Sequence, residues 1–165
     1  MTPRLAPTSI GVGMDTATIL RRGVLALAGL GIVGTTIELV FLRHWTTATA
    51  AIVWVGIVAL GAGFVALLGQ PSARGVRAVR ILAAAVFLVA VAGIWFHVLE
   101  NLDAGPLDRA FASRWDTMSV LDQWWTAITG GVGPAPTLAP GALAEISLAL
   151  LLATLRHPAM VEATT

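Results

Sequence analysis

The feature that most constrains the fold of this chain is a series of four long apolar runs. A helix rises 1.5 Å per residue, so about 20 apolar residues cross roughly 30 Å of hydrocarbon. The runs cover residues 23–42, 49–68, 79–99 and 138–155. The pattern predicts an all-α polytopic membrane protein whose four transmembrane helices form an up-down bundle.

The composition agrees with a membrane-embedded chain. Hydrophobic residues make up 57% of the 165 residues and charged residues 12%, against about 25% charged residues in soluble domains. Because so few charged side chains cannot coat a soluble surface, lipid must cover the chain. The absence of cysteine excludes disulfides and thiolate metal sites. No internal repeat is visible, so residues 1–165 are interpreted as a single membrane domain.

The arginines predict the orientation of the chain, because cytoplasmic loops carry an excess of basic residues. Seven arginines flank one side of the predicted spans and three flank the other. The first group is Arg4, Arg21, Arg22, Arg74, Arg77, Arg80 and Arg156, and the second is Arg43, Arg109 and Arg114. We expect a bacterial inner membrane protein with both termini in the cytoplasm.

The long connection between the third and fourth spans carries an amphipathic pattern over residues 107–128. Its apolar residues recur at steps of three and four, which favours a helix, broken or continuous. They are Leu107, Phe111, Trp115, Met118, Leu121, Trp125 and Ile128. Tryptophan favours the headgroup region, so Trp115, Trp124 and Trp125 are expected to anchor an interfacial helix on the outer surface.

Five polar residues within or beside the spans need partners, because ionisable groups in hydrocarbon are costly. His97 and Glu100 are three residues apart and share a helical face. Glu38, His44 and Glu145 are expected in the same outer half of the membrane. This set is the candidate site.

Three interpretations of the candidate site stay open. The first is a polar network that holds helix ends together. The second is a metal or haem site, because imidazole and carboxylate ligate transition metals and two imidazoles can ligate haem. The third is a proton or small-ligand role for Glu38 or Glu145, because burial disfavours the charged carboxylate. The sequence requires no cofactor and contains no catalytic motif or nucleic-acid patch.

Small residues in the first two spans predict close helix packing, because they let backbones approach in lipid. They are Gly29, Gly31, Gly34, Thr35, Gly56, Gly61 and Gly63. Such faces pack either against other helices of this chain or against another membrane protein. The predicted function is therefore a non-enzymatic accessory or scaffold subunit of a larger membrane assembly, with a metal- or haem-binding protein as the alternative. Transport is a weaker hypothesis, because four spans would need an oligomer to form a pathway.

Three stretches of the chain resemble an uncharacterised family of small bacterial four-helix membrane proteins. They are residues 37–45, residues 97–101, and residues 138–144 continuing through 155–158, and the resemblance extends over about residues 20–158. It implies four membrane helices and a Glu and His pattern at the outer ends of two of them. It implies no activity.

Overall fold

The computed structural model describes residues 16–46, 48–69, 71–137 and 139–161, and the main regular elements in these ranges are α-helices. The all-α prediction is therefore confirmed. The helices are α1 (Thr16–Phe41), α2 (Ala48–Leu68), α3 (Ala73–Ala104), α4 (Val120–Ile128), α5 (Ala139–Ala153) and α6 (Pro158–Val161).

Three of these helices, α1, α2 and α3, are long and apolar enough to cross a membrane. Their lengths are 26, 21 and 32 residues. The helix in the predicted fourth run is shorter than expected, with 15 residues in α5 instead of the 18 in residues 138–155. At 1.5 Å per residue α5 is about 22 Å long, which is less than the thickness of the hydrocarbon core.

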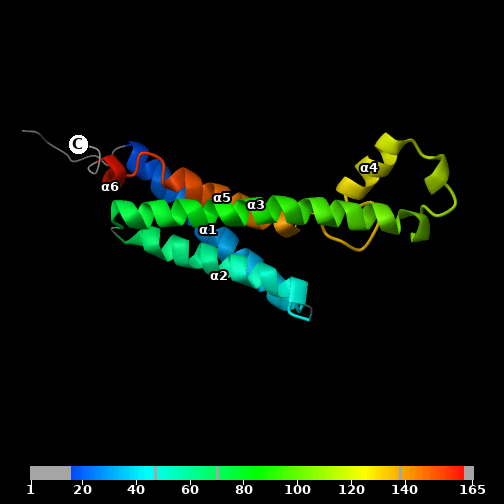
Figure 1. Cartoon of the computed structure of the whole chain (residues 1–165), viewed down its shortest axis with the longest axis horizontal. Helices are drawn as coiled ribbons and strands as arrows, with labels where there is room; N and C mark the ends of the chain where they lie inside the picture. Colours follow the sequence, from blue (N-terminus) through cyan, green and yellow to red (C-terminus); the bar gives the residue numbers. More distant parts are fainter. Residues whose placement is uncertain (1–15, 47, 70, 138, 162–165) are drawn as a thin grey trace, which may run out of the picture.

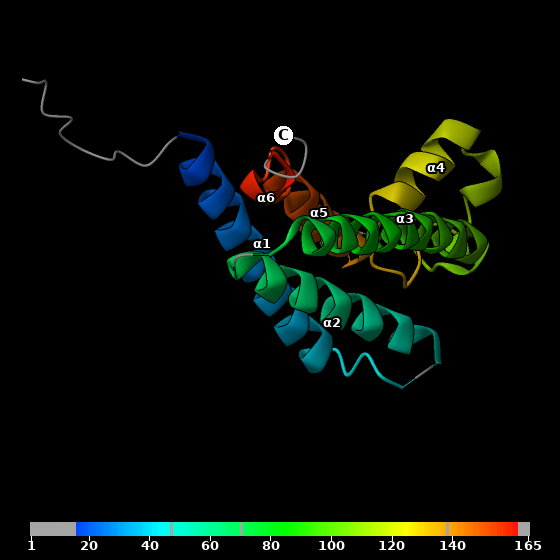
Figure 2. The same cartoon turned by 60° about the vertical axis from the view of Figure 1, so that its left-hand side comes forward.

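The four long helices pack side by side, with α3 and α5 at the centre of the arrangement. Figure 1 shows α3 running the length of the molecule with α5 along its first half, while α1 and α2 diverge from α3 toward their connecting turn. The view in Figure 2 separates α1 and α2 from the far half of α3. Chain direction alternates, so α1 and α3 begin where α2 and α5 end. We call this the arginine end, because it carries Arg21, Arg22, Arg74, Arg77, Arg80 and Arg156.

The main core lies between α1, α2, α3 and α5 and depends on glycine for close helix contact. Leu60 and Leu150 are fully buried in it. A Cβ on Gly31 would lie 2.7 Å from Ile146 of α5, and one on Gly29 would lie 2.9 Å from Phe64 of α2. The predicted packing role of these two glycines is thus confirmed.

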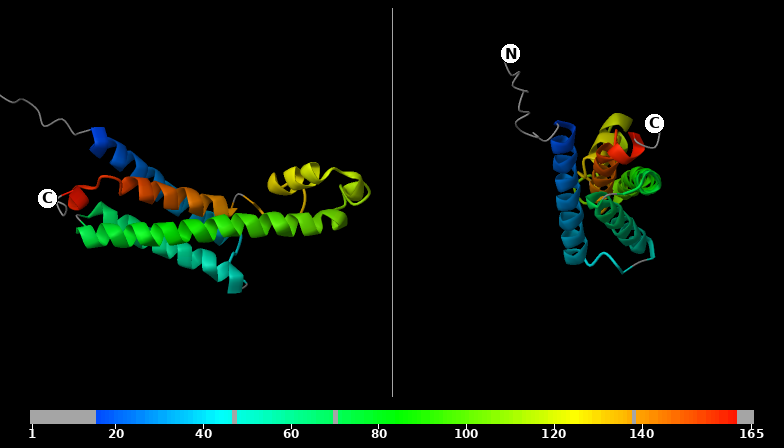
Figure 3. Two further views of the ribbon diagram at one scale, coloured as in Figure 1. Left: turned by 45° about the horizontal axis from the view of Figure 1, so that its top comes forward. Right: turned by 90° about the vertical axis from the view of Figure 1, so that its left-hand side faces the viewer.

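The C-terminal part of α3 carries a second, smaller core beyond the main bundle. Val98, Trp115, Ala127 and Val132 are buried there. Figure 3 shows α4 lying along the second half of α3, on the flank that α5 covers in the first half. We call residues 105–137 together with the end of α3 the cap.

The helix predicted over residues 107–128, broken or continuous, is broken, and only its last part, α4, is α-helical. Two 3-10 turns, Gly105–Leu107 and Trp115–Thr117, precede it. The Asp108 carboxylate accepts the amide of Ala110 at 2.8 Å and holds a turn, and Ser119 caps a new helix by accepting the amide of Asp122. Such local side-chain bonds compete with helix continuation.

Candidate functional site

All six tryptophans of the chain lie at the end of the bundle opposite the arginine end, which we call the tryptophan end. They are Trp45, Trp54, Trp95, Trp115, Trp124 and Trp125. Trp95 of α3 stacks on Trp124 of α4, with 5.5 Å between ring centroids. Trp125 is 68% exposed, whereas Trp115 is 5% exposed and packs inside the cap. The three predicted anchors therefore occupy different environments.

Asn101 ties the cap to α3 from a fully buried position. Its Nδ2 donates to the carbonyls of Ala127 and Ala135 at 3.2 and 2.9 Å, and its Oδ1 accepts the amide of Ala135 at 2.9 Å. Gly133 approaches Asn101 so closely, with a φ of +81°, that a Cβ there would collide with it. A buried side-chain amide with this many partners fixes the path of residues 133–137.

His97 contacts the same segment one turn earlier on α3. Its Nδ1 lies 3.1 Å from the carbonyl oxygen of Pro136, and Gly93, a further turn earlier, lies against Pro140 at the start of α5. Residues 93, 97 and 101 thus lie on one face of α3, and this face contacts the segment from Ala135 to Pro140. The His97 ring therefore contacts a backbone carbonyl, that of Pro136.

Glu100 follows His97 by three residues on α3, but Glu38, His44 and Glu145 do not gather with this pair. Glu38 on α1 and Glu100 on α3 are exposed, and the backbone carbonyl of His44 accepts the Trp54 indole N–H at 2.7 Å. In the part of the chain that the structure describes, no three His, Asp or Glu side chains come together as metal ligands. The reason is geometric, since the outer ends of α1 and α3 diverge (Figure 1).

Glu145 lies apart from this set, in a groove of about 400 Å³ between α1 and α5. The groove is otherwise apolar and is lined by Val24, Leu27, Leu30, Gly31, Ile146 and Leu148, among others. The Glu145 side chain is exposed and forms no hydrogen bond or ion pair with any residue in the described ranges. Ser147, two residues on, donates to the Leu143 carbonyl at 2.7 Å within its own helix.

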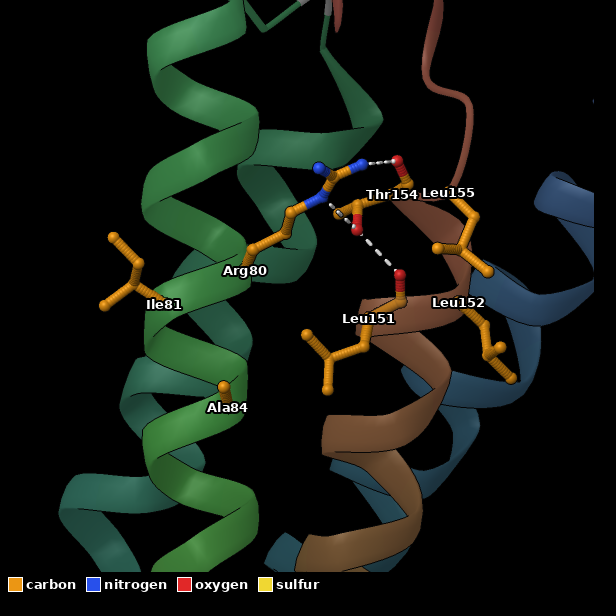
Figure 4. Close-up of a pocket in the computed structure, with 7 residues that line it drawn as sticks. All are labelled: Arg80, Ile81, Ala84, Leu151, Leu152, Thr154 and Leu155. Atoms are coloured by element: carbon orange, nitrogen blue, oxygen red, sulfur yellow. Dashed lines mark hydrogen bonds between the residues drawn. The ribbon is translucent and has the colours of Figure 1, made fainter.

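Two arginines bind the carbonyl end of α5, a feature that the sequence analysis missed. Arg80 of α3 donates through Nε to the Thr154 hydroxyl at 3.0 Å and through Nη2 to the Thr154 carbonyl at 2.6 Å (Figure 4). Arg21 of α1 donates to the carbonyls of Ala153 and Arg156, both at 3.1 Å. Cations are favoured at a helix C-terminus, where carbonyls lack intrahelical partners. The sequence signal for this contact is the position of Arg80 inside the predicted apolar run 79–99, where a charged residue needs a partner.

His157 lies beside these two guanidinium groups. Its Nδ1 is buried and has no hydrogen-bond partner among the residues that are described. Burial lowers the pKa of His157 below 6.5, and the positive charges of Arg21 and Arg80 lower it further. The imidazole therefore disfavours protonation in the folded protein.

Comparisons with protein families, with curated proteins and with solved structures find no match to this chain.

Proposed function

We propose that this chain is a bacterial inner membrane protein with four membrane crossings, and that it acts as a non-enzymatic accessory or scaffold subunit of a larger membrane assembly. In this arrangement α5 is the fourth crossing and both termini are cytoplasmic. The cap lies at the outer surface with α4 in the membrane interface.

The segment before α5 supports a fourth crossing despite the short helix. Backbone polar groups at membrane depth must be satisfied within the protein. Residues 133–137 lie along α3, where Asn101 binds both backbone groups of Ala135 and His97 contacts the carbonyl of Pro136. This segment adds length to α5, and these contacts satisfy the amide and carbonyl of Ala135 and the carbonyl of Pro136.

Cysteine labelling tests the topology, because the chain has no cysteine of its own. Thr16→Cys reports on the arginine end and Ser113→Cys on the cap, and both positions are exposed. In intact spheroplasts, a membrane-impermeant maleimide is expected to label Ser113→Cys and not Thr16→Cys. After permeabilisation, it is expected to label Thr16→Cys as well. The reverse pattern, or labelling of both in intact cells, contradicts the proposed orientation.

The observation that carries the subunit proposal is the position of Glu145. It lies nine residues before Thr154, the residue held by Arg80, and is therefore about 13 Å above the arginine end. This depth is near the middle of the hydrocarbon core. A charged carboxylate there costs several kcal/mol, and within the described ranges no residue pairs with it. A polar or basic group from another chain, seated in the α1–α5 groove, would satisfy it.

Purification from native membranes in mild detergent, followed by native mass spectrometry, tests this proposal. We expect the wild-type chain to appear in a stoichiometric complex, and Glu145→Gln to release most of the partner. Glu100→Gln is the matched control, because it makes the same change at an exposed carboxylate of α3. A stable lone monomer for the wild type, or equal loss of the partner in both variants, contradicts the proposal.

A further inference from the structure

We propose that the arginine end of the α3–α5 interface is a binding site for one anionic phospholipid. The phosphate is held at Arg80, and one acyl chain lies in the apolar groove that runs from Arg80 toward the membrane centre. This site lies between α3 and α5, whereas the Glu145 groove lies between α1 and α5, and Leu152 lines both. The lipid site does not depend on any protein partner.

The groove has the dimensions and chemistry of an acyl-chain site. Its volume is about 430 Å³, and its apolar walls are Ile81 and Ala84 from α3 and Leu151, Leu152 and Leu155 from the end of α5. Figure 4 shows Ala84 and Leu151 beside the space between the two helices and Ile81 on the outer flank of α3, with Arg80 and Thr154 at one end. Ile81 is 72% exposed and Leu155 is 59% exposed, so the groove is open to lipid.

The guanidinium of Arg80 is held in place with its charge uncompensated. Nε and Nη2 donate to Thr154, a neutral partner. Within the described residues Arg80 makes no ion pair, and its Nη1 makes no hydrogen bond. A preorganised arginine with a free donor beside an apolar groove matches a phosphate attached to an acyl chain.

The surrounding charges favour an anionic ligand. Arg77 is three residues before Arg80 and therefore on a neighbouring position of the same helix face, and Arg156 is exposed just beyond α5. The acidic residues in the described ranges lie elsewhere, either at the tryptophan end or, in Glu145, within α5. Basic pockets between membrane helices bind anionic lipid headgroups, with each basic residue contributing about 1 kcal/mol.

Native mass spectrometry of the full chain in detergent, titrated with lipids of identical acyl chains, tests the site. Phosphatidylglycerol is expected to bind the wild type at one preferred site, and phosphatidylcholine to bind at least about fivefold more weakly, the factor that corresponds to about 1 kcal/mol. Arg80→Gln is expected to weaken phosphatidylglycerol binding by a similar factor. Ala84→Leu, which fills the groove and keeps every charge, is expected to do the same.

Two control variants separate this site from general attraction. Arg74→Gln removes the same charge from another face of α3, and Ala92→Leu adds the same bulk at an exposed position outside the groove. Both should bind phosphatidylglycerol as the wild type does. The proposal is overturned if Arg74→Gln weakens binding as much as Arg80→Gln does, if Ala84→Leu binds normally, or if the two lipids bind equally. Should Arg80→Gln lose its helical circular dichroism, the comparison of Ala84→Leu with Ala92→Leu decides the question.

Discussion

Asn101 and Ala135 are joined by a reciprocal pair of hydrogen bonds between the Asn101 side-chain amide and the Ala135 backbone. The Asn101 Nδ2 donates to the Ala135 carbonyl, and the Ala135 amide donates to the Asn101 Oδ1, each at 2.9 Å. Asn101 thereby satisfies both backbone groups of a buried residue outside regular structure. This pairing fixes the segment that leads from the cap into α5.

Replacing Asn101 with alanine should loosen the cap while leaving the main bundle folded. The change leaves the amide and the carbonyl of Ala135 without a partner, and each buried unsatisfied group costs about 1–3 kcal/mol. For these two groups we expect a loss of about 2–6 kcal/mol in the free energy of unfolding. Hydrogen exchange measured by mass spectrometry should show faster exchange over residues 127–137 and little change in α2.

Thr129→Ala is the control for Asn101→Ala, because it removes an exposed side-chain hydrogen bond in the same region. It should leave exchange over residues 130–137 near the wild-type rate. Equal exchange in the two variants would show that Asn101 does not hold this segment.

Gly105→Ala should disturb the cap through a single added methyl group. Gly105 has an ordinary helical φ of −51°, so backbone strain is not the cause. The new Cβ would instead collide with the indole of Trp115, and overpacking of this kind costs about 1–3 kcal/mol. The near-ultraviolet circular dichroism of tryptophan should weaken, together with a loss of thermal stability.

Gly34→Ala, the same substitution at another glycine, should not destabilise the protein. A Cβ on Gly34 meets nothing within 4 Å, and alanine favours a helix interior over glycine by up to about 1 kcal/mol. Gly34→Ala should therefore be neutral or stabilising. A large destabilisation there, with none in Gly105→Ala, would contradict the packing described for the cap.

The long apolar helices could be predicted from the sequence because their signals are local. Apolar run length predicts α1, α2 and α3, and the small residues Gly29 and Gly31 predict close helix contacts that the structure contains. Gly34 and Gly61 belong to the same small-residue pattern, yet a Cβ at either position would meet nothing within 4 Å. Composition alone does not say which side of a helix faces its neighbours.

The sequence could not show whether the residues of the candidate site lie close together, because their distances depend on the directions in which the helices run. His97 and Glu38 both lie toward the outer ends of their helices, but α3 continues into the cap while α1 turns away (Figure 1). Asn101 was passed over because a neutral amide gives no charge signal in sequence. Its three bonds become visible only when residues 127–135 are folded against α3.

Arg43→Gly should stabilise the end of α1. Arg43 has a φ of +49°, and the amides of Arg43 and His44 bond to the carbonyls of Val40 and Leu39 in a Schellman arrangement. Residues other than glycine adopt this conformation at a cost of about 1 kcal/mol or more. Unfolding in mixed micelles should show a gain of about 1 kcal/mol for Arg43→Gly. Arg43→Ala should show no such gain, because alanine meets the same steric penalty; equal gains would indicate removal of charge as the cause.

His97→Ala should affect the attachment of the cap and leave the metal content unchanged. The His97 ring lies 3.1 Å from the Pro136 carbonyl, and in the described part of the chain no three His, Asp or Glu side chains come together as a ligand set. Elemental analysis and absorption spectra after growth with ample iron, copper and zinc should therefore be the same for the wild type and His97→Ala. Stoichiometric metal or a Soret band that disappears in His97→Ala would instead support the metal or haem hypothesis.

Stability should fall as the pH decreases below about 6.5, and His157 is expected to cause part of that fall. Burial and the charges of Arg21 and Arg80 place the pKa of His157 in the folded protein below its value of 6.5 in the unfolded chain. Above pH 6.5 both states hold a neutral imidazole, so the contribution is constant. Between the two pKa values the unfolded state binds more protons, so stability decreases with decreasing pH and levels off below the folded pKa.

Unfolding midpoints measured in mixed micelles between about pH 8 and pH 5 test this dependence. His157→Gln should flatten the decrease below pH 6.5, because glutamine does not titrate, while leaving the midpoint at high pH close to that of the wild type. His44→Gln is the matched control, since it removes an imidazole at the tryptophan end, away from Arg21 and Arg80, and it should keep the wild-type slope. A slope that persists in His157→Gln and disappears in His44→Gln would place the responsible group at the tryptophan end instead.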